Sequence, residues 1–252
     1  MFTSILSSII IWSAVLIIAL RVVTNSGIQF SNNKYISELT CYKGTSSNYE
    51  TTKKDILCVF LLAFSFRIIV FLFSVVIIYM FNDSINSFGD ILEQYMKWDA
   101  NNYVRIATGG YTYYTEGENF TTLAFFPLYP WLMRIVNIIF RDLRVSGLLT
   151  SFALYSGACC FLYKLFSIDY SKSVAVRAIV YMSVFPHALF FGTLMNESML
   201  LFTSAATLYY IRKHKWHLVG IWGAAAALSR MLGILLAIPA AVEWLEHYKI
   251  FE

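Results

Sequence analysis

The sequence predicts an all-α protein, a polytopic bundle of transmembrane helices. Of its 252 residues, 58% are hydrophobic and only 13% are charged, whereas soluble domains are nearer one half apolar and one quarter charged. Several apolar runs approach the ~20 residues that cross a bilayer as a helix, where irregular chain would leave backbone polar groups unsatisfied. The predicted spans are residues 5–23, 55–81, 145–163, 176–192, 196–211 and 217–242.

The first span, residues 5–23, is expected to remain as an anchor helix. No basic segment precedes it and no small-residue cleavage site follows, so it does not resemble a cleaved signal peptide. A polar loop rich in Ser, Thr, Asn and Lys comes next. We therefore expect two parts: residues 1–54, with the anchor and a cytoplasmic loop, and residues 55–252, with the transmembrane bundle.

Residues 125–140 are ambiguous, because the run is short for a span and contains two prolines and Arg134. They form either a crossing helix or a segment lying in or dipping into the interface. If they do not cross, most loop lysines and arginines share one side, which the positive-inside rule assigns to the cytoplasm. This arrangement places the polar segment 82–124 and the turn 195–198 together on the outer side.

The outer loop 82–124 is predicted to contain two short helices. Asn82, Asp83 or Ser84 could cap the first. Its apolar stripe suits a helix lying in the membrane interface and consists of Phe88, Ile91, Leu92, Tyr95 and Met96. The second helix, "ANNYVRIAT", begins after Asp99 and ends at Gly109-Gly110.

Asp99 has two interpretations at the start of this second helix. An Asp in that position commonly caps the helix, and the neighbouring Trp98 suits an interfacial anchor. Alternatively, Asp99 is a general base at the membrane surface that takes a proton from an acceptor hydroxyl. Local sequence does not decide between the two.

Four segments, in order along the chain, resemble one enzyme family. "WDANNYVRIATGGY" followed by "LAFFPLYPWLMRIV" looks like the signature of the PIG-V type mannosyltransferases, which add the second mannose of GPI anchors, and of their bacterial relatives. "SVFPHALFFGTLMNESMLLF" is similar to the family's Pro-containing helix and Glu-Ser turn. "LSRMLGILLAIPAAVEW" is similar to its Arg-x-x-Gly helix.

The resemblance implies a glycosyltransferase of the GT-C superfamily, with residues 55–252 as its transmembrane domain and 82–124 as the catalytic loop. Such enzymes transfer a sugar, here mannose, from a polyprenyl- or dolichyl-phosphate donor to an extracytoplasmic glycan or glycolipid acceptor. The implied reaction inverts the anomeric carbon, with Asp99 as catalytic base, and needs no metal or other cofactor. Two departures are Met195, where the family has Tyr, and the end of the chain at Glu252, so an inactive fragment is an alternative.

The remaining candidates for substrate binding each have a structural alternative. Glu197 lines the site or stabilises the next helix as an N-terminal acid. Arg230 binds the donor phosphate or pairs with a carboxylate such as Glu197. Arg105 steadies the leaving phosphate or snorkels to the interface. His187 touches the substrate or sits at a helix break, Tyr111 stacks on sugar or belongs to an aromatic belt, and Trp98 and Asn102 flank Asp99 as further candidates.

Composition also limits location and partners. No basic tract of the nucleic-acid-binding kind is present, and the four cysteines show no disulfide or metal spacing. The Ile-, Asn-, Lys- and Tyr-rich composition favours a multi-pass protein of a bacterial cell membrane; in a eukaryote the ER membrane is expected. A transporter or flippase-like protein is the main alternative, although no internal repeat supports it.

Overall fold

The computed structural model describes residues 16, 51–82, 85–111 and 122–248. The chain divides into two compact units, residues 1–45 and 46–252. Of the first unit only Leu16, in a helix, is described, so the predicted span 5–23 lies almost wholly outside the described residues. Asp83 and Ser84 also lie outside them.

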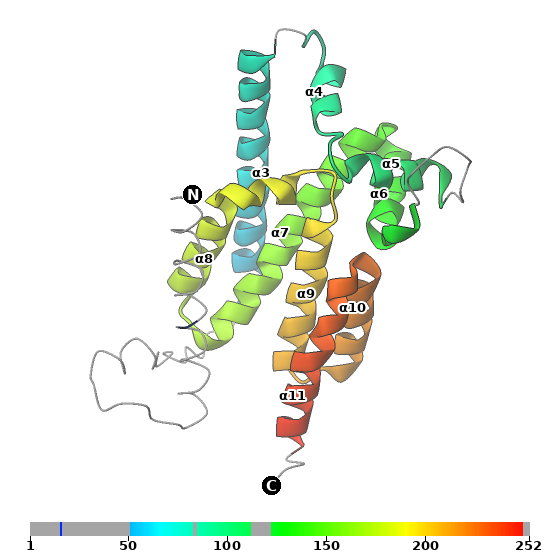
Figure 1. The fold of residues 1–252 in the computed structure, drawn as a ribbon. Helices are drawn as coiled ribbons and strands as arrows, with labels where there is room; N and C mark the ends of the chain where they lie inside the picture. Colours follow the sequence, from blue (N-terminus) through cyan, green and yellow to red (C-terminus); the bar gives the residue numbers. More distant parts are fainter. Residues whose placement is uncertain (1–15, 17–50, 83–84, 112–121, 249–252) are drawn as a thin grey trace. The chain divides into compact units, whose positions relative to one another are not determined.

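The second unit is a helical bundle, which confirms the predicted all-α class; the described residues contain no strand. The long central helix α7 packs against α3, α6, α8 and α9, while α10 packs on α9 (Figure 1). These helices are α3 (Lys53–Phe81), α6 (Leu128–Phe140), α7 (Leu143–Asp169), α8 (Lys172–Val184), α9 (Glu197–Arg212) and α10 (Trp216–Ser229).

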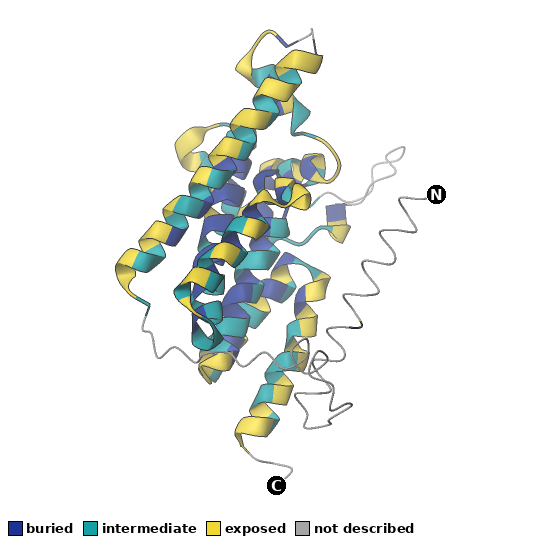
Figure 2. Ribbon diagram, turned by 90° about the vertical axis from the view of Figure 1, so that its left-hand side faces the viewer, coloured by how far each residue is buried: buried dark blue, intermediate teal, exposed yellow. Residues whose placement is uncertain are grey.

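Helix α3 begins with a capping box, in which the Thr52 side chain and the Asp55 carboxylate satisfy each other's backbone N–H groups. It is apolar on all sides, but only Val59, Ala63 and Arg67 are buried. Figure 2 shows this helix exposed along most of its length, with the buried residues gathered in the middle of the bundle. An apolar helix with so much exposed surface is suited to contact lipid.

The described residues contain two helices long and apolar enough to cross a membrane, α3 and α7. A third candidate is the pair formed by α8 and the 3-10 helix η2 (Pro186–Gly192), bent by 84°. The predicted span 176–192 is therefore broken. Pro186 lacks a backbone N–H and disfavours helical conformation in Phe185, which is extended.

Arg67 compensates for this break. Its guanidinium donates to the carbonyl of Ser183 at 2.7 Å and to that of Ala188, and it lies 4.4 Å from the centre of the Tyr155 ring. These two carbonyls flank the bend at Phe185-Pro186. A buried arginine, 1% exposed, thus satisfies backbone groups that the interrupted helix leaves without partners.

The prediction of one span over residues 217–242 is wrong. Helix α10 ends at Ser229, Arg230 is extended, and the chain reverses through η3 (Met231–Leu236) into α11 (Ala237–His247), which runs back beside α9 (Figure 1). At Gly233 the returning chain lies so close that a Cβ atom would be 2.2 Å from the Ala226 carbonyl. Glycine is therefore required for this close approach.

Three short helices cover one end of the bundle: α4 (Phe88–Gln94), α5 (Ala100–Gly109) and α6, with the 3-10 turn η1 (Thr122–Ala124) before α6. Ser87 caps α4, whereas the predicted cap Asn82 is instead the residue that ends α3. Within the predicted apolar stripe, Ile91 and Leu92 are buried in protein, while Phe88 is exposed. The stripe therefore packs partly on the bundle.

Helix α6, the ambiguous segment, has only 13 residues and packs on α7 through Tyr129 and Met133. Its other face exposes Trp131, Ile135, Ile138 and Ile139. Such a helix is too short to cross a bilayer, and its exposed apolar face suits the interface.

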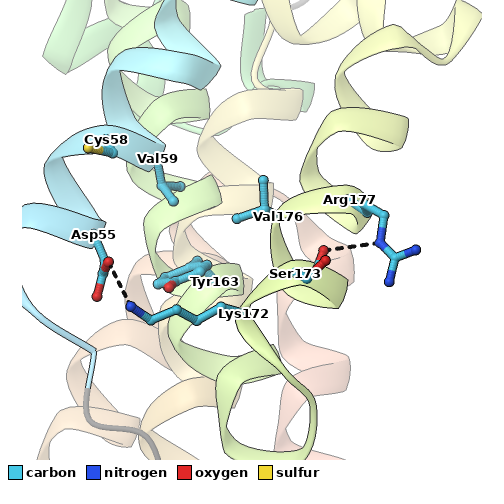
Figure 3. Close-up of a pocket in the computed structure, with 8 residues that line it drawn as sticks. All are labelled: Asp55, Cys58, Val59, Tyr163, Lys172, Ser173, Val176 and Arg177. Atoms are coloured by element: carbon cyan, nitrogen blue, oxygen red, sulfur yellow. Dashed lines mark hydrogen bonds and ion pairs between the residues drawn. The ribbon is translucent and has the colours of Figure 1, made fainter.

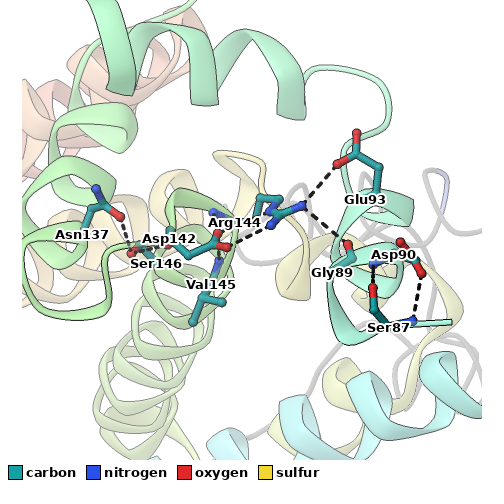
Figure 4. Close-up of polar contacts among 9 residues, drawn as sticks. All are labelled: Ser87, Gly89, Asp90, Glu93, Asn137, Asp142, Arg144, Val145 and Ser146. Atoms are coloured by element: carbon teal, nitrogen blue, oxygen red, sulfur yellow. Dashed lines mark hydrogen bonds and ion pairs between the residues drawn. The ribbon is translucent and has the colours of Figure 1, made fainter. Parts of the chain in front are cut away.

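An ionic cluster joins α4 to the start of α7 (Figure 4). Asp142 caps α7 by accepting from the N–H groups of Arg144 and Val145, and its carboxylate also contacts the Arg144 guanidinium at 3.0 Å. The same guanidinium reaches the Glu93 carboxylate at 3.4 Å. The cluster therefore holds the helix that precedes Trp98-Asp99 against the bundle.

Candidate functional site

Asp99 lies where the chain passes from α4 into α5. Trp98 has a positive φ of 54°, a left-handed conformation that is rare for a bulky residue. Asp99 occupies the N-cap position of α5, but its side chain makes no capping hydrogen bond; Asn102 and Tyr103 donate to its backbone carbonyl instead. The Asp99 carboxylate is therefore not used to cap the helix that Asp99 precedes.

Helix α5 is fixed at both ends and along one face. Ala100, Tyr103, Ile106 and Ala107 are buried against the bundle. At the C-terminal end, the Arg134 side chain donates to the carbonyls of Ala107 and Thr108, at 2.8 and 3.1 Å. The predicted end at Gly109-Gly110 is confirmed, and Gly110 has φ 80°. A rigidly held helix gives the Asp99 backbone a defined position.

A cavity of about 520 Å³ lies in front of Asp99, within the range of small-molecule sites. Three segments form it: the junction of α4 and α5, the 3-10 helix η2, and the start of α9. Its lining residues are Trp98, Asp99, His187, Phe190, Phe191, Met195 and Glu197. The structure thus brings together four of the residues that the sequence singled out, Trp98, Asp99, His187 and Glu197.

Arg230 adjoins this cavity through Glu197. The guanidinium Nη1 lies 2.9 Å from Glu197 Oε1, while Glu197 Oε2 is buried and without a hydrogen-bond partner in the described part of the chain. Beside this pair, Asn196 Nδ2 donates to the Ser229 carbonyl at 2.6 Å. The start of α9 is therefore tied to the end of α10 by one ion pair and one buried hydrogen bond.

The charged side chains around the cavity change the pKa of Tyr103, whose phenol lies on the buried face of α5. Burial raises the pKa of Tyr103, and the nearby carboxylates of Glu197 and Asp99 raise it further, while Arg230 opposes them. Tyr103 therefore remains a neutral phenol at physiological pH. The two carboxylates on different elements contribute to one local negative field.

Aromatic side chains form one wall of the cavity. The ring of Phe190 lies 5.7 Å from Trp98 and 6.3 Å from His187, measured between ring centres. Aromatic faces such as these can pack against the apolar face of a sugar ring. Phe190 and Phe191 were not singled out from the sequence, because they belong to the apolar run 176–192 that predicted an ordinary span. Met195 was noted there only as a departure from the family, not as a residue of the site.

Three other candidates do not line the cavity. Arg105 is exposed on α5, and Asn102 is partly buried on the same helix. Tyr111 donates its hydroxyl to the Phe125 carbonyl at 2.7 Å, so it joins the end of α5 to the chain before α6. Within the described ranges, no group of three His, Cys, Asp or Glu side chains is placed to hold a metal ion.

Residues 126–250 match the family described as dolichyl-phosphate-mannose-protein mannosyltransferase. His187, Glu197 and Arg230 lie within the matched segment, whereas Trp98 and Asp99 precede it. No curated protein and no solved structure matches the chain. Residues 126–250 are therefore similar to a domain of this mannosyltransferase family, in a chain whose described residues include two helices long and apolar enough to cross a membrane.

Proposed function

We propose that the chain transfers mannose from a polyprenyl- or dolichyl-phosphate donor to a hydroxyl of a glycan or glycolipid, on the outer face of a cell membrane. One observation carries the proposal: the Asp99 carboxylate makes no capping hydrogen bond and lines a cavity together with Trp98, His187 and Glu197. The adjoining family match supports mannose as the sugar and a lipid phosphate as the carrier, because the family is named for dolichyl-phosphate-mannose. The positive-inside rule supports the outer face.

The proposed reaction is a single inverting displacement. Asp99 accepts the proton of the acceptor hydroxyl while the oxygen of that hydroxyl forms a bond to the anomeric carbon of mannose. The bond from this carbon to the phosphate oxygen breaks, and the lipid phosphate leaves with the electron pair. Asp99 then releases its proton to solvent. The products are a mannoside of inverted configuration and the lipid monophosphate.

The other cavity residues have binding roles in this proposal. Trp98 and Phe190 offer aromatic faces to the sugar, and His187 lies next to them. Glu197 Oε2 is a buried acceptor that no described residue hydrogen-bonds, so it is suited to accept a hydrogen bond from a sugar or acceptor hydroxyl. Arg230, held on Glu197 Oε1, is close enough to the cavity to neutralise a phosphate.

A closer relation to the PIG-V type enzymes is a further part of the proposal. It is supported by the four sequence segments and by the position of Asp99 in the loop that precedes the matched domain. It implies a glycolipid or glycan acceptor.

Transfer of labelled mannose from polyprenyl-phosphate mannose in isolated membranes tests the proposal. We expect the wild type to form a mannoside with inverted configuration, and Asp99→Asn to lower the rate at least a hundredfold. Glu246→Gln is the control, because it removes an exposed carboxylate near the end of α11, outside the cavity. Equal rates in Asp99→Asn and the control would contradict the role of Asp99.

A transporter for a lipid-linked substrate is the second candidate. The breaks at Pro186 and Arg230 favour it, because interrupted helices are typical of transporters. Reconstituted vesicles distinguish the two functions. A transporter moves the lipid-linked sugar between leaflets without forming a mannoside, whereas the enzyme forms a mannoside only when acceptor is present.

A further inference from the structure

A second cavity, of about 370 Å³, lies between α3, α7 and α8 (Figure 3). It opens at the end of the bundle where α3 and α8 begin and α7 ends. The Asp99 cavity, in contrast, lies where α8 has ended and α9 begins. The second cavity is therefore separate from the proposed catalytic site.

The rim of this cavity carries more positive than negative charge. Lys172 Nζ lies 3.0 Å from the Asp55 carboxylate, so that one cation is already balanced. Arg177 stands on the other side, with its Nε donating to the Ser173 carbonyl at 3.2 Å (Figure 3). Its two terminal nitrogens make no hydrogen bond to any described residue, and the side chain is exposed. One exposed guanidinium thus remains to bind an anion.

The start of α8 adds to this positive potential. Ser171 is its N-cap residue, but the Ser171 side chain makes no capping hydrogen bond. A 13-residue helix with an uncapped first turn presents N–H groups and the positive end of its dipole. This feature reinforces the charge of the neighbouring Arg177.

The walls of the cavity are apolar and open toward the lipid-facing surface. Val59 and Val176 form them, together with the ring of Tyr163. Cys58, which also lines the cavity, is exposed, and so are Leu57 and Leu61 on the same part of α3. A small inorganic anion would not use such walls, whereas the glycerol and first methylenes of a lipid would.

We propose that this cavity binds the headgroup of an anionic phospholipid. Arg177 and the start of α8 contact the phosphate, and the valine walls contact the glycerol region. The predicted topology assigns this end to the cytoplasmic leaflet, where basic pockets between transmembrane helices bind anionic headgroups. The site is independent of the proposed transferase activity.

The test is the thermal unfolding of the full chain in neutral detergent during titration with phosphatidylglycerol. We expect the unfolding temperature to rise with phosphatidylglycerol and not with phosphatidylcholine or sodium phosphate. Arg177→Gln should raise the half-saturating lipid concentration about fivefold, because a basic residue near an anionic lipid contributes roughly 1 kcal/mol. Val176→Phe, which fills the cavity, should weaken binding at least as much.

Arg212→Gln is the matched control. Arg212 is an arginine at the same end of the bundle, but it pairs with Asp169 on the surface, away from the cavity. It should bind phosphatidylglycerol like the wild type. The proposal is overturned if Arg177→Gln and Val176→Phe also titrate like the wild type. A response to phosphatidylcholine equal to that to phosphatidylglycerol, or one reproduced by sodium phosphate alone, would overturn it as well.

Discussion

Arg230 and Glu197 form an ion pair of 2.9 Å between two helix ends that are 33 residues apart in the sequence. The pair joins the end of α10 to the start of α9, beside the cavity that contains Asp99. It places a cation next to Glu197 Oε2, a buried carboxylate oxygen that has no hydrogen-bond partner among the residues that the structure describes. Arg230, which lies in the middle of the predicted span 217–242, is therefore located beside the proposed site.

The ion pair predicts a specific pattern of stability in a double-mutant cycle. Arg230→Gln leaves the half-buried Glu197 carboxylate unpaired, so it should destabilise more than the double variant Arg230→Gln/Glu197→Gln. Because both side chains are partly exposed, we expect a coupling of about 1 kcal/mol or less. Thermal unfolding of the four proteins in detergent measures it, and additive effects would show that the pair contributes nothing.

Removing the hydrogen bonds of Arg67 is predicted to cause a larger loss of stability. Arg67→Met retains the length of the side chain but removes the donors to the carbonyls of Ser183 and Ala188. Leaving two buried acceptors unsatisfied should destabilise the protein by about 3 kcal/mol. Ile69→Met, on the exposed face of the same helix, is the control and should change little. A melting temperature of Arg67→Met equal to that of the control would refute this role.

A side chain at position 233 is predicted to clash with the backbone of α10. Gly233→Ala places a Cβ atom 2.2 Å from the backbone of Ala226, which cannot move without disturbing α10. We expect a loss of about 3 kcal/mol and lower mannose transfer, because the turn that carries Arg230 shifts. Gly220→Ala is the matched control, since nothing lies within 4 Å of its added Cβ. Unfolding curves of both variants give the comparison, and equal stability would contradict the close approach.

The stabilising contribution of Asp142 is predicted to depend on pH in the acidic range. Hydrogen bonds from Arg144 hold the pKa of this carboxyl below its usual value of about 4. Because the folded pKa is the lower one, Asp142 contributes stability above the unfolded pKa, and this contribution disappears as the pH falls through the folded pKa. Asp142→Asn should therefore be less stable than the wild type at pH 6 and approach it below pH 4. Melting temperatures across this range test the prediction, and a constant difference would contradict it.

Local signals explain what the sequence predicted correctly. Gly109-Gly110 correctly marked the end of α5, because a glycine with positive φ ends a helix within one turn. Asp99 correctly marked its start, although the Asp99 side chain makes no capping hydrogen bond there. The long apolar runs that became α3 and α7 were equally clear. Helical geometry also explains why Arg105 is not at the cavity, since six residues at roughly 100° each turn it to another face than Asp99.

Tertiary contacts explain what the sequence did not show. The run 217–242 is apolar apart from His217, Ser229 and Arg230, so its mean hydropathy predicted one continuous span and not a reversal at Arg230. That reversal depends on Glu197 and Asn196 from another helix and on the fit of Gly233 against Ala226. Phe190 and Phe191 likewise line the cavity only because the chain bends at Pro186.

The most direct test of the central claim is the rate of mannose transfer by Asp99→Asn at saturating polyprenyl-phosphate mannose, compared with the wild type in the same membranes. Donor binding is measured in parallel with radiolabelled lipid. If Asp99 is the catalytic base, Asp99→Asn binds the donor as the wild type does but transfers mannose at least a hundredfold more slowly. Transfer by Asp99→Asn at the wild-type rate would contradict the account.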